Sequence, residues 1–159
     1  MHGETQANRL AQLIQKQGNL PHYELALPLV TVRSSSLKKL DINSILLLGM
    51  NDLECVLMDN NAICATVVLV KLPYSYAMKV LKIDKEPVVQ QDSKKSEMIK
   101  LSFGKVQSRT LDIGYTIDVS QVNLEKVTLV YREKKIATAS LINVEGEIAV
   151  KIDKVEENE

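Results

Sequence analysis

Two aspartates are the residues of this chain whose placement could support chemistry. Asp41 and Asp112 occupy the same short motif, Leu-Asp-Ile, which occurs twice at a spacing of 71 residues. A positioned carboxylate can act as a general base or a nucleophile in hydrolysis, but an aspartate at a turn commonly accepts hydrogen bonds from nearby backbone amides. We expect the second role, because Asn43 and Gly114 follow the motif and tolerate the positive φ of a tight turn. A hydrolase that uses Asp41 or Asp112 therefore ranks last among the functions considered.

Other groups that titrate or bind metals are few. The two histidines, His2 and His22, lie outside the repeated motifs, and no His, Cys or carboxylate cluster has metal-ligand spacing. The sequence has no Gly-rich phosphate loop and no nucleophile elbow. Cys55 and Cys64 could meet across a hairpin, but in a reducing compartment we expect buried small hydrophobic residues rather than a disulfide. The prediction is a protein without enzymatic activity or cofactor.

Composition and charge narrow the class further. A length of 159 residues suits one ordinary domain or two very small ones. The 20 basic and 20 acidic side chains cancel, and 4% aromatic residues without Trp leave little to neutralise phosphates or stack on bases. Nucleic acid is therefore not an expected partner. Because no apolar run could cross a bilayer and the N-terminus lacks the pattern of a signal peptide, we expect a cytoplasmic protein without membrane insertion.

The repeated motif belongs to a longer internal duplication. At the same spacing, Leu53-Glu54 aligns with Leu124-Glu125, and a further slide of two residues aligns 63–66 with 136–139. Such self-similarity indicates two copies of one supersecondary unit. A copy of about 60 residues has only a marginal core of its own. We therefore expect the two copies to pack on each other or on further subunits.

Alternation of apolar and polar residues predicts β-strands in both copies. The expected opening strands are 25–32, where Pro28 indicates an edge or a bulge, and 99–103. Hairpins are predicted over 53–70 and 127–142. The second hairpin is predicted to be two residues longer, an even difference that keeps the side chains on their proper faces.

These patterns predict a division of the chain into four parts. Residues 1–20 are expected to form an amphipathic N-terminal helix, and 26–83 a first small β domain. The polar, Pro-bearing stretch 84–96 is the expected linker. Residues 97–155 are then the second domain.

With these residues laid out, the second copy resembles a SpoA domain. This is the C-terminal module of bacterial FliM/FliN-type flagellar switch proteins and of the SctQ family of type III secretion. The resemblance rests on a spaced pattern: the strand 99–103 with Gly104, the motif Leu111-Asp112-Ile113-Gly114, the returning strand 136–142 and the closing strand 148–152. The family usually has Gly-Asp where this chain has Gly114-Tyr115, and Gly-Glu where it has Ala139-Ser140. The first copy resembles the more divergent upstream SpoA domain of SctQ proteins, and tandem SpoA domains point to SctQ because FliM and FliN carry one each.

The resemblance implies a fold and a role. The fold would be mainly β with short helices: two small SpoA-type domains packed as an intertwined, strand-swapped pair, preceded by a short N-terminal helix. The role would be a non-catalytic scaffold of the cytoplasmic sorting platform, the C-ring equivalent, at the cytoplasmic face of the inner membrane. The implied partners are a FliH/SctL-like stator protein, the ATPase complex indirectly, and other SctQ copies.

The resemblance also implies a surface for the stator peptide. Transfer of the relatives' apolar patch onto this chain gives six partner-binding positions: Leu141, Ile142 and Val144 in the second copy, and Val68, Leu69 and Val70 in the first. Because strand side chains alternate, about half of the six must face the core.

Two further functions stay open at this point. The same fold could serve the flagellar motor switch, with FliM, FliN and FliH as partners. A more distant alternative is a small β-barrel that binds a small ligand or nucleic acid. An arrangement in which the two halves share strands would separate a SpoA pair from ordinary tandem barrels.

Overall fold

The computed structural model describes residues 21–73, 75–108 and 111–156. Within these ranges the predicted mainly β class is confirmed, since antiparallel strands form nearly all the regular structure and α2 (Ser34–Lys38) is the one helix. The helix expected in residues 1–20 lies outside the described residues. No helix in the described ranges is long and apolar enough to span a membrane.

The two halves of the chain contain strands in the same order. The first half has β1 (His22–Ala26), β2 (Val30–Arg33), β3 (Ile45–Met50), β4 (Glu54–Asp59), β5 (Ala62–Lys71) and β6 (Tyr76–Pro87). The second half has β7 (Ser96–Gln107), β8 (Thr116–Asp118), β9 (Lys126–Tyr131), β10 (Lys134–Val144) and β11 (Glu147–Val155). Pro28 lies in the break between β1 and β2, which both pair with β7, as expected of a residue without an amide hydrogen. In chain order, β3 to β6 correspond to β8 to β11, and β1 together with β2 corresponds to β7.

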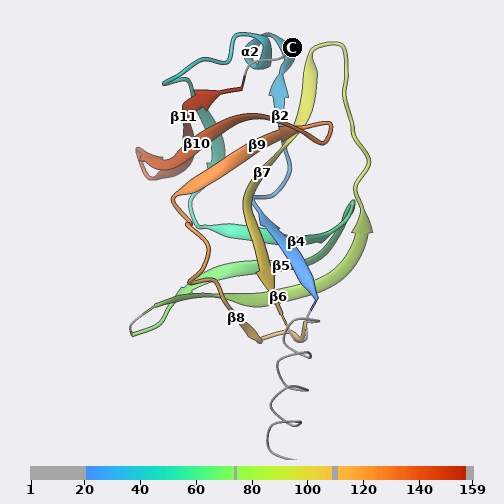
Figure 1. Cartoon of the computed structure of the whole chain (residues 1–159), viewed down its shortest axis with the longest axis vertical. Coiled ribbons are helices and arrows are strands. Elements are labelled where there is room, and N and C mark those ends of the chain that lie inside the picture. Colours follow the sequence, from blue (N-terminus) through green and yellow to red (C-terminus); the bar gives the residue numbers. More distant parts are fainter. Residues whose placement is uncertain (1–20, 74, 109–110, 157–159) are drawn as a thin grey trace, which may run out of the picture.

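The strands form one sheet whose order reflects this correspondence. The order is β3-β11-β10-β9-β7-β1-β4-β5-β6-β8, with β2 beside β7. This order is symmetric. When each strand is replaced by its counterpart in the other half and the list is read backwards, the same order results. β3 of the first half pairs with β11 of the second, and β8 of the second half pairs with β6 of the first. Figure 1 shows β9 to β11 near α2 and β4 to β6 with β8 at the other end, while β7 runs between the two groups.

These two pairings also have the same register. Ala149 lies opposite Leu47 in one, and Ala77 lies opposite Asp118 in the other. Leu47 and Asp118 are 71 residues apart, and Ala77 and Ala149 are 72 apart, so corresponding residues meet in both ladders. The duplication in the sequence is thus a duplication of strand pairing as well.

The repeated motif forms the same turn in both halves. Asn43 has φ of 72° and Gly114 has φ of 87°, so the predicted positive φ is confirmed at both positions. The amide of Asn43 donates to the carbonyl oxygen of Ile152 at 2.8 Å, and the amide of Gly114 donates to that of Val80 at 2.8 Å. Each turn is therefore bonded through its backbone to the closing strand of the other half.

The connection between the halves is shorter than predicted. Residues 84–87, assigned to a linker over 84–96, continue β6, whose last residue Pro87 pairs with Ala62 at the start of β5. The charged side chains of this end of β6 are exposed, which gave the segment the composition of a linker. Residues 88–95 make the connection to β7.

The predicted difference in hairpin length is wrong. The β4–β5 hairpin closes with Asp59 opposite Ala62, and the β9–β10 hairpin closes with Tyr131 opposite Lys134. Each turn therefore contains two residues, and a constant spacing of 72 relates the two hairpins. The sequence match of 63–66 with 136–139 is one residue out of register, because similar small apolar residues recur along both returning strands.

One hydrophobic core serves both halves. Its largest buried members come from eight strands and the segment after β1: Leu25, Leu27, Leu57, Val67, Met78, Val80, Ile99, Leu101, Ile117, Leu129, Val150 and Ile152. Ile117 of β8 is 2% exposed and lies opposite Met78 of β6, so the short strand of the second half is packed into this core beside the first. Each half of about 60 residues thus gains burial that it could not reach alone.

Candidate functional site

The six predicted partner-binding positions divide between the two faces of their strands. Leu69 and Leu141 pack against the hydrophobic core. Because side chains alternate along a strand, the other four project from the opposite face, where they are half-buried: Val68, Val70, Ile142 and Val144. Two of the six are therefore core residues, and four contribute to the outer surface.

The spacing of 72 also changes which positions correspond. Leu72 is the counterpart of Val144, and it is 40% exposed. Val68 corresponds to Ser140 rather than to a residue of the predicted set. Sequence comparison missed Leu72 because it aligned the returning strands one residue out of register.

An apolar surface runs from β10 to the edge of the sheet at β3. Ile142 lies opposite Ala149 of β11, which in turn lies opposite Leu47 of β3. Ala149 is fully buried between these larger neighbours, whereas Leu47 is 64% exposed and Ile45 is 50% exposed. This surface is named the outer apolar patch, and it consists of Ile45, Leu47, Ile142 and Val144.

The corresponding face of the first half is interrupted by charge. Val70 lies opposite Ala77, and Ala77 lies opposite Asp118 of β8, at the place that Leu47 occupies in the other half. The backbone amide of Ser120 donates to Asp118 at 2.9 Å and, with the Ser120 side chain, lowers the pKa of that carboxyl. The carboxylate stays charged at neutral pH, so the first half offers no continuous apolar row to its sheet edge.

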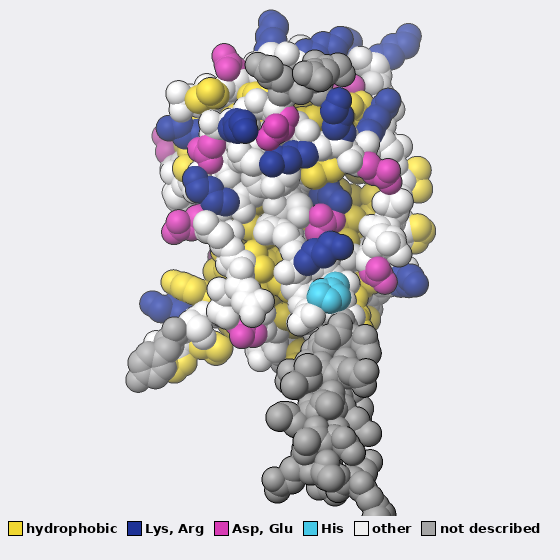
Figure 2. Space-filling model, in the orientation of Figure 1, with side chains coloured by type: hydrophobic (Ala, Val, Ile, Leu, Met, Phe, Trp, Pro, Cys, Tyr) yellow, Lys and Arg dark blue, Asp and Glu magenta, His cyan; other side chains and the backbone are white. Residues whose placement is uncertain are grey.

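Polar side chains border the outer apolar patch. Lys126 forms an ion pair with Asp153 at 3.2 Å, and the hydroxyl of Ser140 donates to Asp153 at 2.6 Å. The Ser140 hydrogen bond is the main cause that lowers the pKa of Asp153. On the face shown in Figure 2, basic and acidic side chains are likewise interspersed, with hydrophobic side chains between them.

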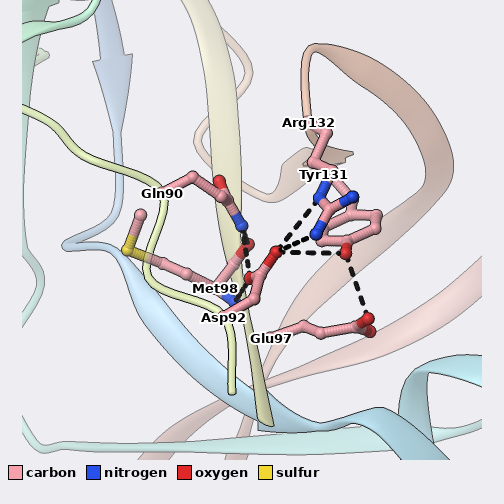
Figure 3. A network of polar contacts seen from close by, with 6 residues as sticks. All are labelled: Gln90, Asp92, Glu97, Met98, Tyr131 and Arg132. Atoms are coloured by element: carbon pink, nitrogen blue, oxygen red, sulfur yellow. Dashed lines mark hydrogen bonds and ion pairs between the residues drawn. The ribbon is translucent and has the colours of Figure 1, made fainter. Parts of the chain in front are cut away.

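A second cluster lies where the connection between the halves meets the β9–β10 turn (Figure 3). One oxygen of Asp92 accepts from Arg132, with Nε at 3.0 Å, and the other accepts from Gln90 at 2.7 Å and from the amide of Met98 at 3.1 Å. The hydrogen bond from Arg132, supported by the other donors, lowers the pKa of Asp92 to about 2. The cluster fastens 88–95 to the turn and to the start of β7.

Tyr131 extends this cluster. Its hydroxyl lies 3.0 Å from a carboxylate oxygen of Glu97 and 3.3 Å from one of Asp92, and the guanidinium of Arg132 lies 5.1 Å from the ring centroid. Burial and the hydrogen bond to Glu97 raise the pKa of Tyr131. The tyrosine therefore stays protonated at neutral pH and serves as a hydrogen-bond donor.

A cleft of about 680 Å³ lies beside the cluster. Its lining combines apolar side chains, among them Met58 and Val88, with the charged groups Lys100 and Arg132. Both cations have carboxylate partners, since Lys100 lies 2.6 Å from Glu24 and Arg132 pairs with Asp92. This pairing favours a structural role for the charges: the Lys100–Glu24 pair joins β7 to β1, and the Arg132–Asp92 pair joins the β9–β10 turn to the connection.

The two candidate catalytic aspartates lie in the repeated turns. The side chain of Asp41 accepts a hydrogen bond from the amide of Ile42 at 2.7 Å, so the expected local role is confirmed there. The carbonyl oxygen of Asp112 accepts from the amide of Tyr115 at 2.9 Å, which closes the corresponding turn. Among the described residues no group of three or more His, Cys, Asp or Glu side chains is arranged to hold a metal ion.

The two cysteines are free thiols, and of the two only Cys55 is buried as predicted. Cys55 is fully buried in the core, and burial raises its pKa to about 12. Cys64 is half-buried, and its thiol lies 3.9 Å from the carbonyl oxygen of Ala62. Cys55 therefore acts as a small hydrophobic residue, as predicted.

Comparison with known proteins identifies no family. No protein-family model matches the chain, and no curated protein matches it. The case for a function therefore rests on the strand pairing and on the outer apolar patch.

Proposed function

We propose that the chain is a non-catalytic scaffold of the SctQ type, in which two SpoA-like domains form one intertwined, strand-swapped unit. The observation that carries this proposal is the reciprocal pairing of β3 with β11 and of β8 with β6, in the same register. Strands that follow one another along a chain usually pair with near neighbours, so tandem barrels would complete each sheet from their own half. A pair of SpoA domains that exchange strands accounts for the crossing in both directions.

In this role the chain is part of the cytoplasmic sorting platform of a type III secretion system, at the cytoplasmic face of the inner membrane. Its partners are a FliH/SctL-like stator protein, the ATPase complex through that protein, and other copies of the scaffold. The presence of two copies in one chain favours this role over that of a FliM or FliN protein in the flagellar switch.

The outer apolar patch is the proposed docking surface for the stator protein. Exposed apolar side chains surrounded by polar groups are typical of protein interfaces. Ile142 and Val144 lie on adjacent outward positions of β10, and Leu47 continues their surface to β3. An apolar segment of the stator would lie across these strands and cover them.

A binding measurement with matched variants tests this proposal. Titration calorimetry of the chain with the N-terminal segment of an SctL-type protein is expected to give saturable binding. Ile142→Asn is expected to weaken it at least about tenfold, because it places a polar amide at the centre of the interface. Val70→Asn, at the corresponding position of the first half, is expected to leave the affinity unchanged.

Three results would count against the proposal or redirect it. Absence of binding at high micromolar concentration contradicts the role in secretion. Equal weakening by Ile142→Asn and Val70→Asn contradicts the assignment of the surface. Tighter binding of the corresponding FliH segment would assign the chain to the flagellar switch.

A further inference from the structure

The two strands that end the sheet differ in how well they are protected. β3 has six residues and no charged side chain, whereas β8 has three residues and ends in Asp118. An edge strand exposes unpaired amide and carbonyl groups, and proteins usually protect it with short length or charge. β8 has both protections, and β3 has neither.

The hydrogen bonding of β3 shows which of its backbone groups are directed outward. The carbonyl oxygen of Ser44 accepts from the amide of Ile152 in β11 at 2.8 Å. Because peptide groups alternate in direction along a strand, those of Ile45 and Leu47 are directed away from the sheet. After Leu47 a register shift in the β3–β11 ladder and the positive φ of Gly49 end the regular stretch. The edge therefore offers the peptide groups of Ile45 and Leu47 to an incoming strand.

We propose that two copies of this chain join through β3, antiparallel about a two-fold axis, so that their two sheets become continuous. With the axis at Leu46, Ile45 of one copy lies opposite Leu47 of the other, and the outward peptide groups of both strands form hydrogen bonds. Ile45 and Leu47, now 50% and 64% exposed, become cross-strand apolar pairs on the outer face.

Charge and symmetry favour a second copy of the chain as the partner that pairs with the β3 edge. β3 has no charged side chain, so its apposition with itself places no like charges opposite one another, and the 20 basic and 20 acidic residues of the chain cancel. A contact about a two-fold axis uses β3 of both copies and closes the assembly. The edges that remain are the β8 edges, which have only three residues and carry the charged side chain of Asp118, so they are protected from pairing with a further copy. The assembly therefore stops at a dimer and does not grow into a fibre.

This inference needs no stator protein and does not rest on the proposed function. The dimer depends on the outward peptide groups of the β3 edge, whereas the centre of the stator surface is Ile142 of β10. Ile142→Asn is therefore expected to weaken stator binding and to leave the dimer intact, which distinguishes a failure of the proposed function from a failure of this inference.

Sedimentation equilibrium of the full chain tests the dimer. The mass is expected to rise with concentration from 17.8 kDa to twice that value. Leu47→Lys brings positive charges to the contact, and Leu47→Pro removes an amide that donates across it while remaining compatible with an edge strand. Both variants are expected to stay at the monomer mass. Ile113→Lys changes an apolar side chain that is 72% exposed outside β3, and it is expected to dimerise normally.

Hydrogen exchange of the unchanged chain gives a measurement that does not depend on how the variants fold. The amides of Ile45 and Leu47 are expected to become protected as concentration rises, while those of β8 stay unchanged. A chain that remains monomeric at all concentrations overturns the proposal. So does a dimer that persists in folded Leu47→Lys and Leu47→Pro variants, because it would use another surface or another partner strand.

Discussion

At the scale of single residues, Asp92 joins separate parts of the chain, and the sequence around it does not predict these contacts. Its side chain is 15% exposed and is bonded to Arg132 of the β9–β10 turn and to the amide of Met98 in β7. The segment 84–96 has the polar composition of a linker, and nothing in it predicts a partner 40 residues further along. Asp41, in contrast, could be predicted because its partner is the next residue.

The ionisation of Asp92 is expected to contribute to acid stability. Its pKa is about 2 in the folded chain, against an ordinary value of 3.8. A carboxyl whose pKa is lowered by folding stabilises the native state above its ordinary pKa and loses that contribution as the pH falls toward the folded value. The free energy of unfolding of the native protein should therefore decrease between about pH 4 and pH 2 more steeply than that of Asp92→Asn.

Urea unfolding at a series of pH values measures this difference. Asp92→Asn is expected to be less stable than the native protein at pH 7 and to approach it at the acidic end. Asp84→Asn is the matched control, because Asp84 is an exposed carboxylate whose ion pair with Lys82 spans 3.4 Å. Parallel pH profiles for the native protein and Asp92→Asn would show that Arg132 does not hold this carboxylate.

At the scale of elements, local patterns predicted the strands but not their neighbours. Alternation predicted the hairpins over 53–70 and 127–142, and the two-residue turns lie within them. The partner of β3 could not be predicted, since its ladder joins residues about 100 positions apart and no local pattern encodes that pairing. Alternation also did not predict which residues form the outer apolar patch. It places Leu141 and Ile142 on opposite faces of β10, but it does not indicate which of these faces packs on the core.

The repeated turn allows a direct test of why Asn and Gly alternate in the motif. A Cβ at Gly114 would meet no atom within 4 Å, so the cost of substitution there comes from the φ of 87° alone. Gly114→Val is expected to lower the free energy of unfolding by about 1–3 kcal/mol, since a β-branched residue is strained in this region. Gly114→Asn is expected to cost much less, because Asn43 adopts the same conformation at the corresponding position.

Chemical denaturation of Gly114→Val and Gly114→Asn measures the loss in the free energy of unfolding for each variant. A clear loss for Gly114→Val and a small one for Gly114→Asn would support the positive φ as the reason for the motif. Equal losses would instead mean that the absence of a side chain is what the turn requires.

At the scale of the whole molecule, the two halves form one folding unit. Buried residues of both halves belong to the same core, and β3 and β8 each extend the sheet of the other half. The sequence predicted this dependence from the small size of each copy. It could not predict the symmetric strand order, because that order results from pairings between strands of different halves.

Cleavage between the halves tests this account most directly. A protease site inserted after Val89, which is 67% exposed in the connection 88–95, allows the chain to be cut without removing a strand. We predict that the cut halves remain together as one species of unchanged mass in native mass spectrometry, and that they unfold in a single transition. Separation into two independently folded fragments would contradict the claim that the halves share strands and a core.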